Sequence, residues 1–164
     1  MNLRTLNSLT PDEAISFLRP CVDIPRWIED VAGARPFGDV RHLLDHAEHA
    51  APDWTDAEIE QALSHHPRIG EQPAGASAEA GHSRREQAGL STSTDTAALI
   101  RDGNVAYERT FGRVFLIRAA GRSAEEILRA LTERLDNPPD VELPVVAHEL
   151  REIALLRLEG MVEP

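Results

Sequence analysis

The sequence predicts an all-α protein, a single-domain bundle of several helices, and three observations support this. Aromatic residues make up only 4% of the 164 residues, so the core has to be built from Leu, Ile, Val and Ala. Runs in which apolar and polar residues alternate, as in half-buried strands, are few. Apolar residues instead recur at helical spacing, after Ser or Thr residues that can cap a helix. The length favours one domain, residues 1–164, around one hydrophobic core.

Start and stop signals place the helices of the N-terminal half. Thr10 and Glu13 form one capping box, and Thr55 and Glu58 form another. Proline and glycine residues end these helices, because proline disfavours helical backbone in the residue before it and glycine tolerates the left-handed conformation at a helix end. The predicted helices run from Thr10 to Pro20, from Pro25 to Gly33, from Asp39 to Ala50, and from Thr55 to His65 or His66.

The middle of the chain is predicted to contain a loop and one long helix. Residues 70–82 are rich in Gly, Ala and Glu, which favours a loop that could cover a site. Ser83 is predicted to cap a following helix, with Glu86 as its capping-box partner. This interpretation of Glu86 competes with a catalytic one. A long helix is expected from Thr94 or Asp95 to Phe111, ended by Gly112.

Two further helices are predicted after an apolar run at residues 114–117, which is expected to be extended or to start a helix because one strand cannot build a sheet. Gly121, Arg122 and Ser123 form a predicted turn, and Ser123 with Glu126 is a capping box. Residues 137–139 break the chain. The core face of the first of these helices is formed by Ile127, Leu128, Leu131 and Leu135, and the last helix runs from about Val141 to Met161.

The net charge and the hydropathy of the chain argue against nucleic-acid and membrane partners. The formal net charge of −11 argues against a nucleic-acid partner, because a phosphate backbone requires a basic surface. No apolar run approaches the length of a transmembrane helix, so no membrane partner is expected. The N-terminus also lacks the charged and apolar regions of a signal peptide. A cytoplasmic protein is therefore expected.

The cysteine and histidine residues offer few candidates for a nucleophile or a metal site. Cys21 is the single cysteine and is predicted to be a small buried apolar residue rather than a nucleophile. His42, His46 and His49 have a spacing that can place them on one helix face, where two of them could bind zinc. An ordinary amphipathic helix is the favoured interpretation. A metal-dependent hydrolase built on His42, His46 and His65 or His66 remains the rival.

The segment from His66 to Glu71 is the strongest candidate for a catalytic site in the sequence. Pro67 requires the preceding helix to stop, so His66 is expected to project from a helix end. A histidine there, with a carboxylate such as Glu86 that can return to it, is a minimal acid–base site. A structural or surface role is the alternative for any single histidine.

Two polar residues fall on apolar helix faces. Asn104 is expected to be a core amide with satisfied hydrogen bonds. Arg157 lies within an apolar stripe of the last helix, so it needs a partner, because an unpaired buried charge costs several kcal/mol or so. An internal ion pair and an anchor for a carboxylate ligand are equally compatible with this position. The stripe consists of Leu150, Ile153, Ala154, Leu158 and Met161.

Several motifs occur in one order along the chain. They are His66 to Glu71; Ser83 to Leu90; Asn104, Tyr107 and Phe111-Gly112; Gly121 to Ser123; Arg134, Leu135 and Asn137; and Glu149 to Leu158. Each motif is weak alone. Their order and spacing together resemble the 2-oxo-4-hydroxy-4-carboxy-5-ureidoimidazoline (OHCU) decarboxylase family, over nearly the whole chain. Arg113 departs from the family pattern, which places an apolar residue there in many members.

The resemblance implies an all-α homodimer that uses neither a metal nor an organic cofactor. It implies decarboxylation of OHCU, a small ureidoimidazoline, to (S)-allantoin and CO₂ in urate degradation. His66, Glu86 and Arg157 match the family's catalytic positions. The matching substrate-contacting positions are Pro67, Ser83, Arg84, Arg85, Glu86, Gln87, Phe115, Leu116, Ile117, Arg118 and Ala119.

A division of roles follows as a hypothesis. His66 would donate the proton, Glu86 and Gln87 would hold N–H groups of the substrate, and Arg157 or a backbone donor would anchor an oxygen. Besides the metal-dependent hydrolase, a non-catalytic helical interaction module is the second rival, and turnover of OHCU would exclude it.

Overall fold

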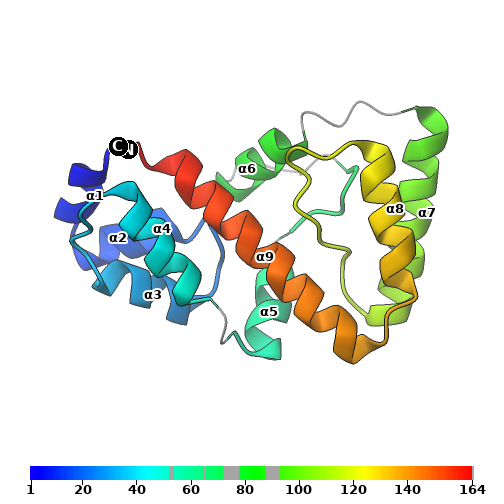
Figure 1. Cartoon of the computed structure of the whole chain (residues 1–164), viewed down its shortest axis with the longest axis horizontal. Coiled ribbons are helices and arrows are strands. Elements are labelled where there is room, and N and C mark those ends of the chain that lie inside the picture. Colours follow the sequence, from blue (N-terminus) through cyan, green and yellow to red (C-terminus); the bar gives the residue numbers. More distant parts are fainter. Residues whose placement is uncertain (52–53, 65, 72–77, 88–92, 164) are drawn as a thin grey trace. The chain divides into compact units, whose positions relative to one another are not determined.

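Nine helices make up most of the described part of the chain in the computed structural model (Figure 1). The structure describes residues 1–51, 54–64, 66–71, 78–87 and 93–163. Within these residues, the only β-type pairing is an isolated bridge between Asn2 and Glu163. The all-α prediction is therefore confirmed. None of the described helices is long and apolar enough to cross a membrane.

The helices are α1 (Leu3–Ser8), α2 (Pro11–Leu18), α3 (Pro25–Gly33), α4 (Val40–His49), α5 (Asp56–Leu63), α6 (Ala78–Gln87), α7 (Thr94–Phe111), α8 (Ala124–Leu135) and α9 (Pro139–Met161). They belong to two units. The first unit comprises Met1–Ala62 and Arg151–Pro164, and the second comprises Leu63–Leu150. Each is described by itself below. The prediction of one domain over residues 1–164 stays a prediction.

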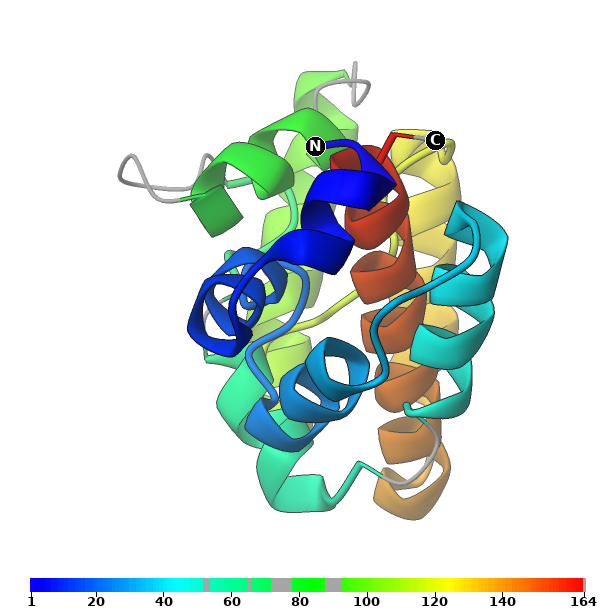
Figure 2. The same ribbon diagram turned by 90° about the vertical axis from the view of Figure 1, so that its left-hand side faces the viewer.

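In the first unit, the two ends of the chain lie side by side (Figure 2). The N-terminal ammonium donates to the Met161 carbonyl at 2.8 Å, and the Leu3 N–H donates to the Glu163 carbonyl at 3.0 Å. The Trp27 indole on α3, 1% exposed, donates to the Ala47 carbonyl on α4 at 2.9 Å. These contacts join the N-terminal end to the end of α9 and α3 to α4, and α2 also packs against α3.

In the second unit, α7 and α8 pack closely against one another. Gly103 permits this approach, because a Cβ atom there would lie 2.4 Å from a methyl carbon of Leu131. Gly112 ends α7 with a φ of 71°, a left-handed conformation that suits glycine. The buried core of this unit is formed by Ile69, Ile100, Tyr107, Phe115, Ile117, Ala119, Ala124, Ile127 and Leu131.

The capping boxes predicted at Thr10, Thr55 and Ser123 are present. Ser123 accepts from the Glu126 N–H at 3.2 Å, and Glu126 accepts from the Ser123 N–H at 2.7 Å. The equivalent pair of bonds joins Thr10 with Glu13 and Thr55 with Glu58. Local hydrogen bonds of this kind depend on only four consecutive residues, so the sequence alone predicts them.

Two helix boundaries differ from the predictions, and one further helix was not predicted. Helix α6 begins at Ala78, so the loop prediction for residues 78–82 and the Ser83 cap are both wrong. Alanine and glutamate are strong helix formers, and here they outweigh the signal of Gly81. Helix α9 begins at Pro139, because proline suits the first turn of a helix. Helix α1, capped by Asn2, was not predicted. His65, residues 72–77 and residues 88–92 lie outside the described part.

Candidate active site

His66 follows the end of α5, as Pro67 predicted. The backbone N–H of His66 donates to the Leu63 carbonyl at 2.9 Å, and His66 is half-buried. The chain then turns at Gly70, whose φ of 83° lies in the left-handed region. A residue with a Cβ atom would be strained there. His66 therefore opens a short loop, residues 66–71, with a defined backbone.

Helix α7 holds this loop at two points. The Asn104 side chain, 2% exposed, donates through Nδ2 to the Ile69 carbonyl at 2.9 Å. One turn further along, Glu108 accepts two hydrogen bonds from the Arg68 guanidinium, one of them at 3.0 Å from Nη2 to Oε2. The expected core amide is confirmed only in part, because the buried Oδ1 atom of Asn104 has no hydrogen-bond partner within the described residues.

Helix α6 reaches the same loop through Gln87. Its Oε1 atom accepts from the Gly70 N–H at 3.0 Å, so its amide NH₂ is the group left to donate elsewhere. Arg84 and Arg85 are exposed on α6, and Arg85 contacts the His82 ring at 2.9 Å. The backbones of the remaining two predicted contacts of this stretch, Ser83 and Glu86, lie on α6, but their side chains lie outside what is described.

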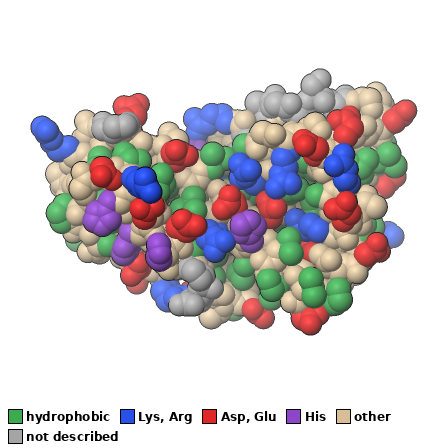
Figure 3. Space-filling view, in the orientation of Figure 1, with side chains coloured by type: hydrophobic (Ala, Val, Ile, Leu, Met, Phe, Trp, Pro, Cys, Tyr) green, Lys and Arg blue, Asp and Glu red, His purple; other side chains and the backbone are tan. Residues whose placement is uncertain are grey.

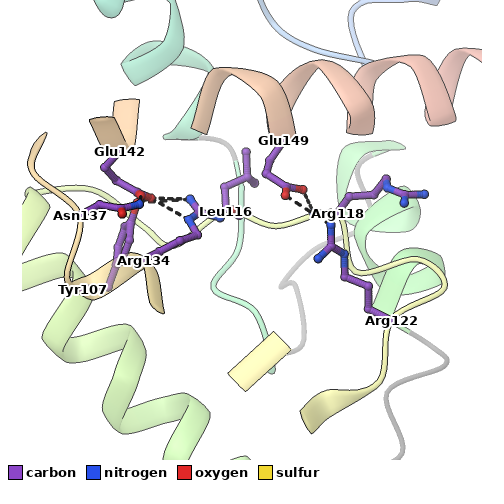
Figure 4. Close-up of polar contacts among 8 residues, drawn as sticks. All are labelled: Tyr107, Leu116, Arg118, Arg122, Arg134, Asn137, Glu142 and Glu149. Carbon is purple, nitrogen blue, oxygen red and sulfur yellow. Dashed lines mark hydrogen bonds and ion pairs between the residues drawn. The ribbon is translucent and has the colours of Figure 1, made fainter. Parts of the chain in front are cut away.

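The third predicted stretch, residues 115–119, is a non-helical segment between α7 and α8. Phe115, Leu116, Ile117 and Ala119 are buried, and Arg118 is half-buried. Two groups of polar side chains hold the backbone of this segment (Figure 4). It is therefore a fixed element rather than a free loop.

The first group centres on Glu142, which is 0% exposed. Its carboxylate accepts from the Arg134 Nε and Nη2 atoms at 2.8 and 2.6 Å, and from the Asn137 amide at 2.8 Å. The Tyr107 hydroxyl donates to it as well. Arg134 in turn donates through Nη1 to the Leu116 carbonyl at 2.8 Å. A buried ion pair thus fixes one backbone group of the segment.

Aromatic rings complete this first group. The Arg134 guanidinium carbon lies 4.6 Å from the centroid of the Phe115 ring, within cation–π range. The rings of Tyr107 and Phe115 meet edge to face, with centroids 5.1 Å apart. Burial, followed by the hydrogen bond to Glu142, raises the pKa of the Tyr107 hydroxyl above its usual value, so Tyr107 acts as a donor.

The second group centres on Glu149. Its Oε2 atom accepts from the Arg118 backbone N–H at 2.8 Å, and its Oε1 atom lies 3.5 Å from Nη2 of Arg122. Arg134 and Glu149 stand in the motifs that carry the family resemblance, but the sequence indicated no site role for either of them, and Glu142 was missed altogether. One signal could have identified the glutamates, which are seven residues apart on α9 and share a face with the buried Val146 and Ile153.

Arg157 belongs to the first unit, whereas His66 and Glu86 belong to the second. Arg157 is 4% exposed and donates to the Pro20 carbonyl at 3.2 Å, so the predicted partner exists. Its neighbour Cys21 is buried as predicted. Burial raises the pKa of the Cys21 thiol to about 12, although the Arg157 charge opposes this shift, and a neutral thiol is a poor nucleophile.

The histidine residues of α4 make ordinary surface contacts, and Figure 3 shows histidine side chains gathered over this helix. His46 lies 2.9 Å from the Asp30 carboxylate, and His49 lies 2.6 Å from the Asp45 carbonyl. Among the described residues, no group of three or more His, Cys, Asp or Glu side chains could hold a metal ion. The amphipathic-helix interpretation accounts for this spacing.

Comparison with known proteins identifies the family. The family model of OHCU decarboxylase matches residues 7–159. This chain belongs to the OHCU decarboxylase family. The 2-oxo-4-hydroxy-4-carboxy-5-ureidoimidazoline decarboxylase of Amia calva is 30% identical over 99% of this chain and 95% of its own length.

Two bifunctional proteins are also similar. The "Uric acid degradation bifunctional protein TTL" of Arabidopsis thaliana is 39% identical over 65% of this chain. The "Uric acid degradation bifunctional protein" of Bacillus sp. (strain TB-90) is 26% identical over 97% of this chain. The aligned part spans 32% of each of these longer proteins.

Solved structures agree with this family. A crystal structure of OHCU decarboxylase in the presence of (S)-allantoin has a TM-score of 0.71 and 28% identity, covering 85% of this chain and 92% of that one. A crystal structure of (S)-allantoin synthase has a TM-score of 0.72 and 16% identity, covering 99% of this chain and 54% of that one, so it shows a shared fold.

Proposed function

We propose that this chain decarboxylates OHCU to (S)-allantoin and CO₂ in urate degradation. Its family, and its similarity to an OHCU decarboxylase crystallised in the presence of (S)-allantoin, support this reaction. The observation in the second unit that carries the proposal is the anchored loop of His66. Asn104 on α7 and Gln87 on α6 both bond to its backbone, which places a titratable ring on a fixed support.

The reaction needs an electron sink and a proton. Breaking the bond to the carboxylate releases CO₂ and leaves an electron pair on the ring carbon. The conjugated C=N and carbonyl groups of OHCU can accept this pair, so the substrate itself supplies the sink. The pair forms a C=C bond to the neighbouring ring carbon, which carries the ureido group, while the nitrogen of the C=N group takes up a proton. Delivery of a proton to one face of that neighbouring carbon, with loss of the hydroxyl proton from the carbon that held the carboxylate, then gives a carbonyl group and a single enantiomer. We assign this proton delivery to His66.

Polar side chains would hold the substrate during these steps. Glu86 would accept hydrogen bonds from ureido or ring N–H groups. Because the Oε1 atom of Gln87 already accepts from Gly70, we assign to Gln87 the donation of its NH₂ to a substrate oxygen, rather than the acceptor role expected from the sequence. Arg157 would anchor a carboxylate or carbonyl oxygen, for which its planar guanidinium is suited.

The remaining contacts are proposed at three places. Pro67 would line the site beside His66. Ser83, Arg84 and Arg85 on α6 would contact the substrate together with Glu86 and Gln87. The backbone of residues 115–119 would supply further donors and acceptors. We also propose a cytoplasmic homodimer, as the family resemblance and the sequence predict.

Circular dichroism of freshly generated OHCU tests the proposal. Spontaneous decay gives racemic allantoin without a lasting signal, whereas the enzyme should give a fast and persistent signal of (S)-allantoin. His66→Ala should abolish this signal in a folded protein, and His49→Ala, a surface histidine variant, should retain it. A chain that does not accelerate the reaction would contradict the function, and full activity of His66→Ala would contradict the assigned proton donor.

Arg157→Lys tests the anchor separately. Lysine keeps the positive charge but offers only a point charge, so most of the activity should be lost if bidentate contact matters. The folded state of the variant is checked by its thermal unfolding. Retained activity of a stable Arg157→Lys protein would remove Arg157 from the proposed machinery.

A further inference from the structure

Ile117 lies in the middle of the segment of residues 115–119. It is 4% exposed, and among the described residues its backbone N–H and C=O, like those of Phe115, have no hydrogen-bond partner. Buried backbone groups without a partner are rare in native proteins, because leaving them unpaired costs free energy. A polar ligand or a water molecule can supply partners to such groups, and Ile117 differs from Phe115 in that side chains hold the backbone of both its neighbours.

The two neighbours of Ile117 are held firmly. The Leu116 carbonyl accepts from Arg134 at 2.8 Å, and the Arg118 N–H donates to Glu149 at 2.8 Å (Figure 4). The C=O of one residue and the N–H of the next point in opposite directions, because they belong to one planar trans peptide group. Fixing the Leu116 carbonyl and the Arg118 N–H therefore directs the N–H of Ile117 away from Arg134 and its C=O away from Glu149.

We propose that Arg134 and Glu149 are positioning residues, which present the N–H and C=O of Ile117 to the planar ring or ureido group of the substrate. This inference rests on the proposed function. A neighbouring donor and acceptor match a cyclic or ureido amide, which offers a C=O and an N–H side by side. Neither Arg134 nor Glu149 touches the substrate itself.

The buried Arg134–Glu142 pair is suited to this positioning role. Burying the Arg134–Glu142 pair carries a desolvation cost that a pair of apolar residues would avoid. Apolar side chains cannot bond to the Leu116 carbonyl, whereas the guanidinium donates to Glu142 and to Leu116 at the same time. The ion pair therefore supplies a directional hold that hydrophobic packing does not.

Variants of Glu149 test the proposal with a conservative control. Glu149→Ala removes the acceptor of the Arg118 N–H, while Glu149→Gln keeps an oxygen there. Arg122→Gln removes the ion-pair partner of Glu149 and leaves the hydrogen bond from the Arg118 N–H to Glu149 in place. We expect kcat/KM for OHCU to fall by roughly 100-fold in Glu149→Ala, since a displacement of about 1 Å can cost this much. Glu149→Gln and Arg122→Gln should retain most of the activity.

Amide hydrogen exchange provides a second readout that does not depend on turnover. Exchange of the peptide containing residues 115–119 should accelerate in Glu149→Ala and stay near that of the unaltered chain in Glu149→Gln. Equal activity of the Ala and Gln variants, or equal exchange in both, would overturn the positioning role. Inactivity of the unaltered chain on OHCU would instead overturn the proposed function and this role with it, whatever the exchange shows.

Discussion

Two stretches of the second unit carry proposed substrate contacts, and their supports differ in burial. The loop of residues 66–71 is held by the Arg68–Glu108 pair, whose side chains are 45% and 27% exposed, and by the Asn104 amide. The segment of residues 115–119 is held by the Arg134–Glu142 pair, whose side chains are 9% and 0% exposed. The same chemical pairing thus acts in two very different dielectric surroundings.

This difference indicates how each stretch responds to change. Water and salt screen an exposed pair, which contributes little to stability, whereas breaking a buried pair leaves an uncompensated charge. We therefore expect the His66 loop to depend mainly on the buried Asn104 amide and to tolerate loss of its ion pair. The segment of residues 115–119 should lose its fixed backbone position when the Arg134–Glu142 pair is broken.

Removal of one buried charge is the strongest test of this comparison. Glu142→Ala leaves Arg134 buried without its carboxylate, so the free energy of unfolding should fall by about 3–5 kcal/mol. Urea unfolding measures this value. The double variant Arg134→Met/Glu142→Leu should recover much of the stability while OHCU turnover stays low. A loss below about 1 kcal/mol, the range of an exposed pair, would contradict the contrast.

Loss of the Asn104 amide should have the next largest effect. Asn104→Ala leaves the buried Ile69 carbonyl without its donor, which should cost about 1–3 kcal/mol of stability. It should also lower kcat, because the loop of His66 loses its buried support. Asn104→Asp, similar in size but lacking the NH₂ donor, is the matched control and should behave like Asn104→Ala. If the aspartate variant were as stable and active as the unaltered chain, the hydrogen bond to Ile69 would not be the support.

Removal of the exposed pair should have a smaller effect. Arg68→Gln should lower the thermal midpoint less than either buried substitution, because solvent already screens the pair. The difference should shrink further as salt is raised from low concentration to 1 M, where the screening length is about 3 Å. A calorimetric series in salt checks this. A salt-independent loss as large as that of Asn104→Ala would place the exposed pair among the principal supports.

The smallest expected effect is a dependence on pH. The hydrogen bond from Arg68 lowers the pKa of the Glu108 carboxyl below its ordinary value of 4.5. The pKa is lower in the folded state, so this pair contributes stability above pH 4.5, and the contribution disappears as the pH falls through the depressed pKa. The thermal midpoints of the unaltered chain and Glu108→Gln should therefore converge on acidification. Midpoints that diverge at low pH would contradict this assignment.

The sequence was most informative where a structural feature depends on neighbouring residues. The capping boxes at Thr10, Thr55 and Ser123 and the end of α7 at Gly112 were all predicted and are all present. Helix α6 shows the limit of local signals, because Gly81 favours a loop whereas the alanine and glutamate residues around it favour a helix, and the helix forms.

Contacts between residues far apart in the chain could not be predicted in the same way. Asn104 bonds to Ile69 across 35 positions, and Glu149 bonds to Arg118 across 31. Nothing in the neighbourhood of either residue indicates its partner. Glu142 and Glu149 stand out in the sequence as charged residues on an apolar helix face, but the sequence does not indicate which groups they bind.

The sequence by itself determined the all-α class, most helix boundaries, the end of α5 before Pro67 and the burial of Cys21 and Arg157. Periodicity, capping and proline geometry act over a few residues, and a buried charge is visible as a break in an apolar stripe. Only the tertiary structure decided that Gln87 presents a donor, that Asn104 supports the His66 loop, and that a buried ion pair holds residues 115–119. Each of these depends on which atoms the packing of α6, α7, α8 and α9 brings within hydrogen-bonding distance, and local sequence does not encode that distance.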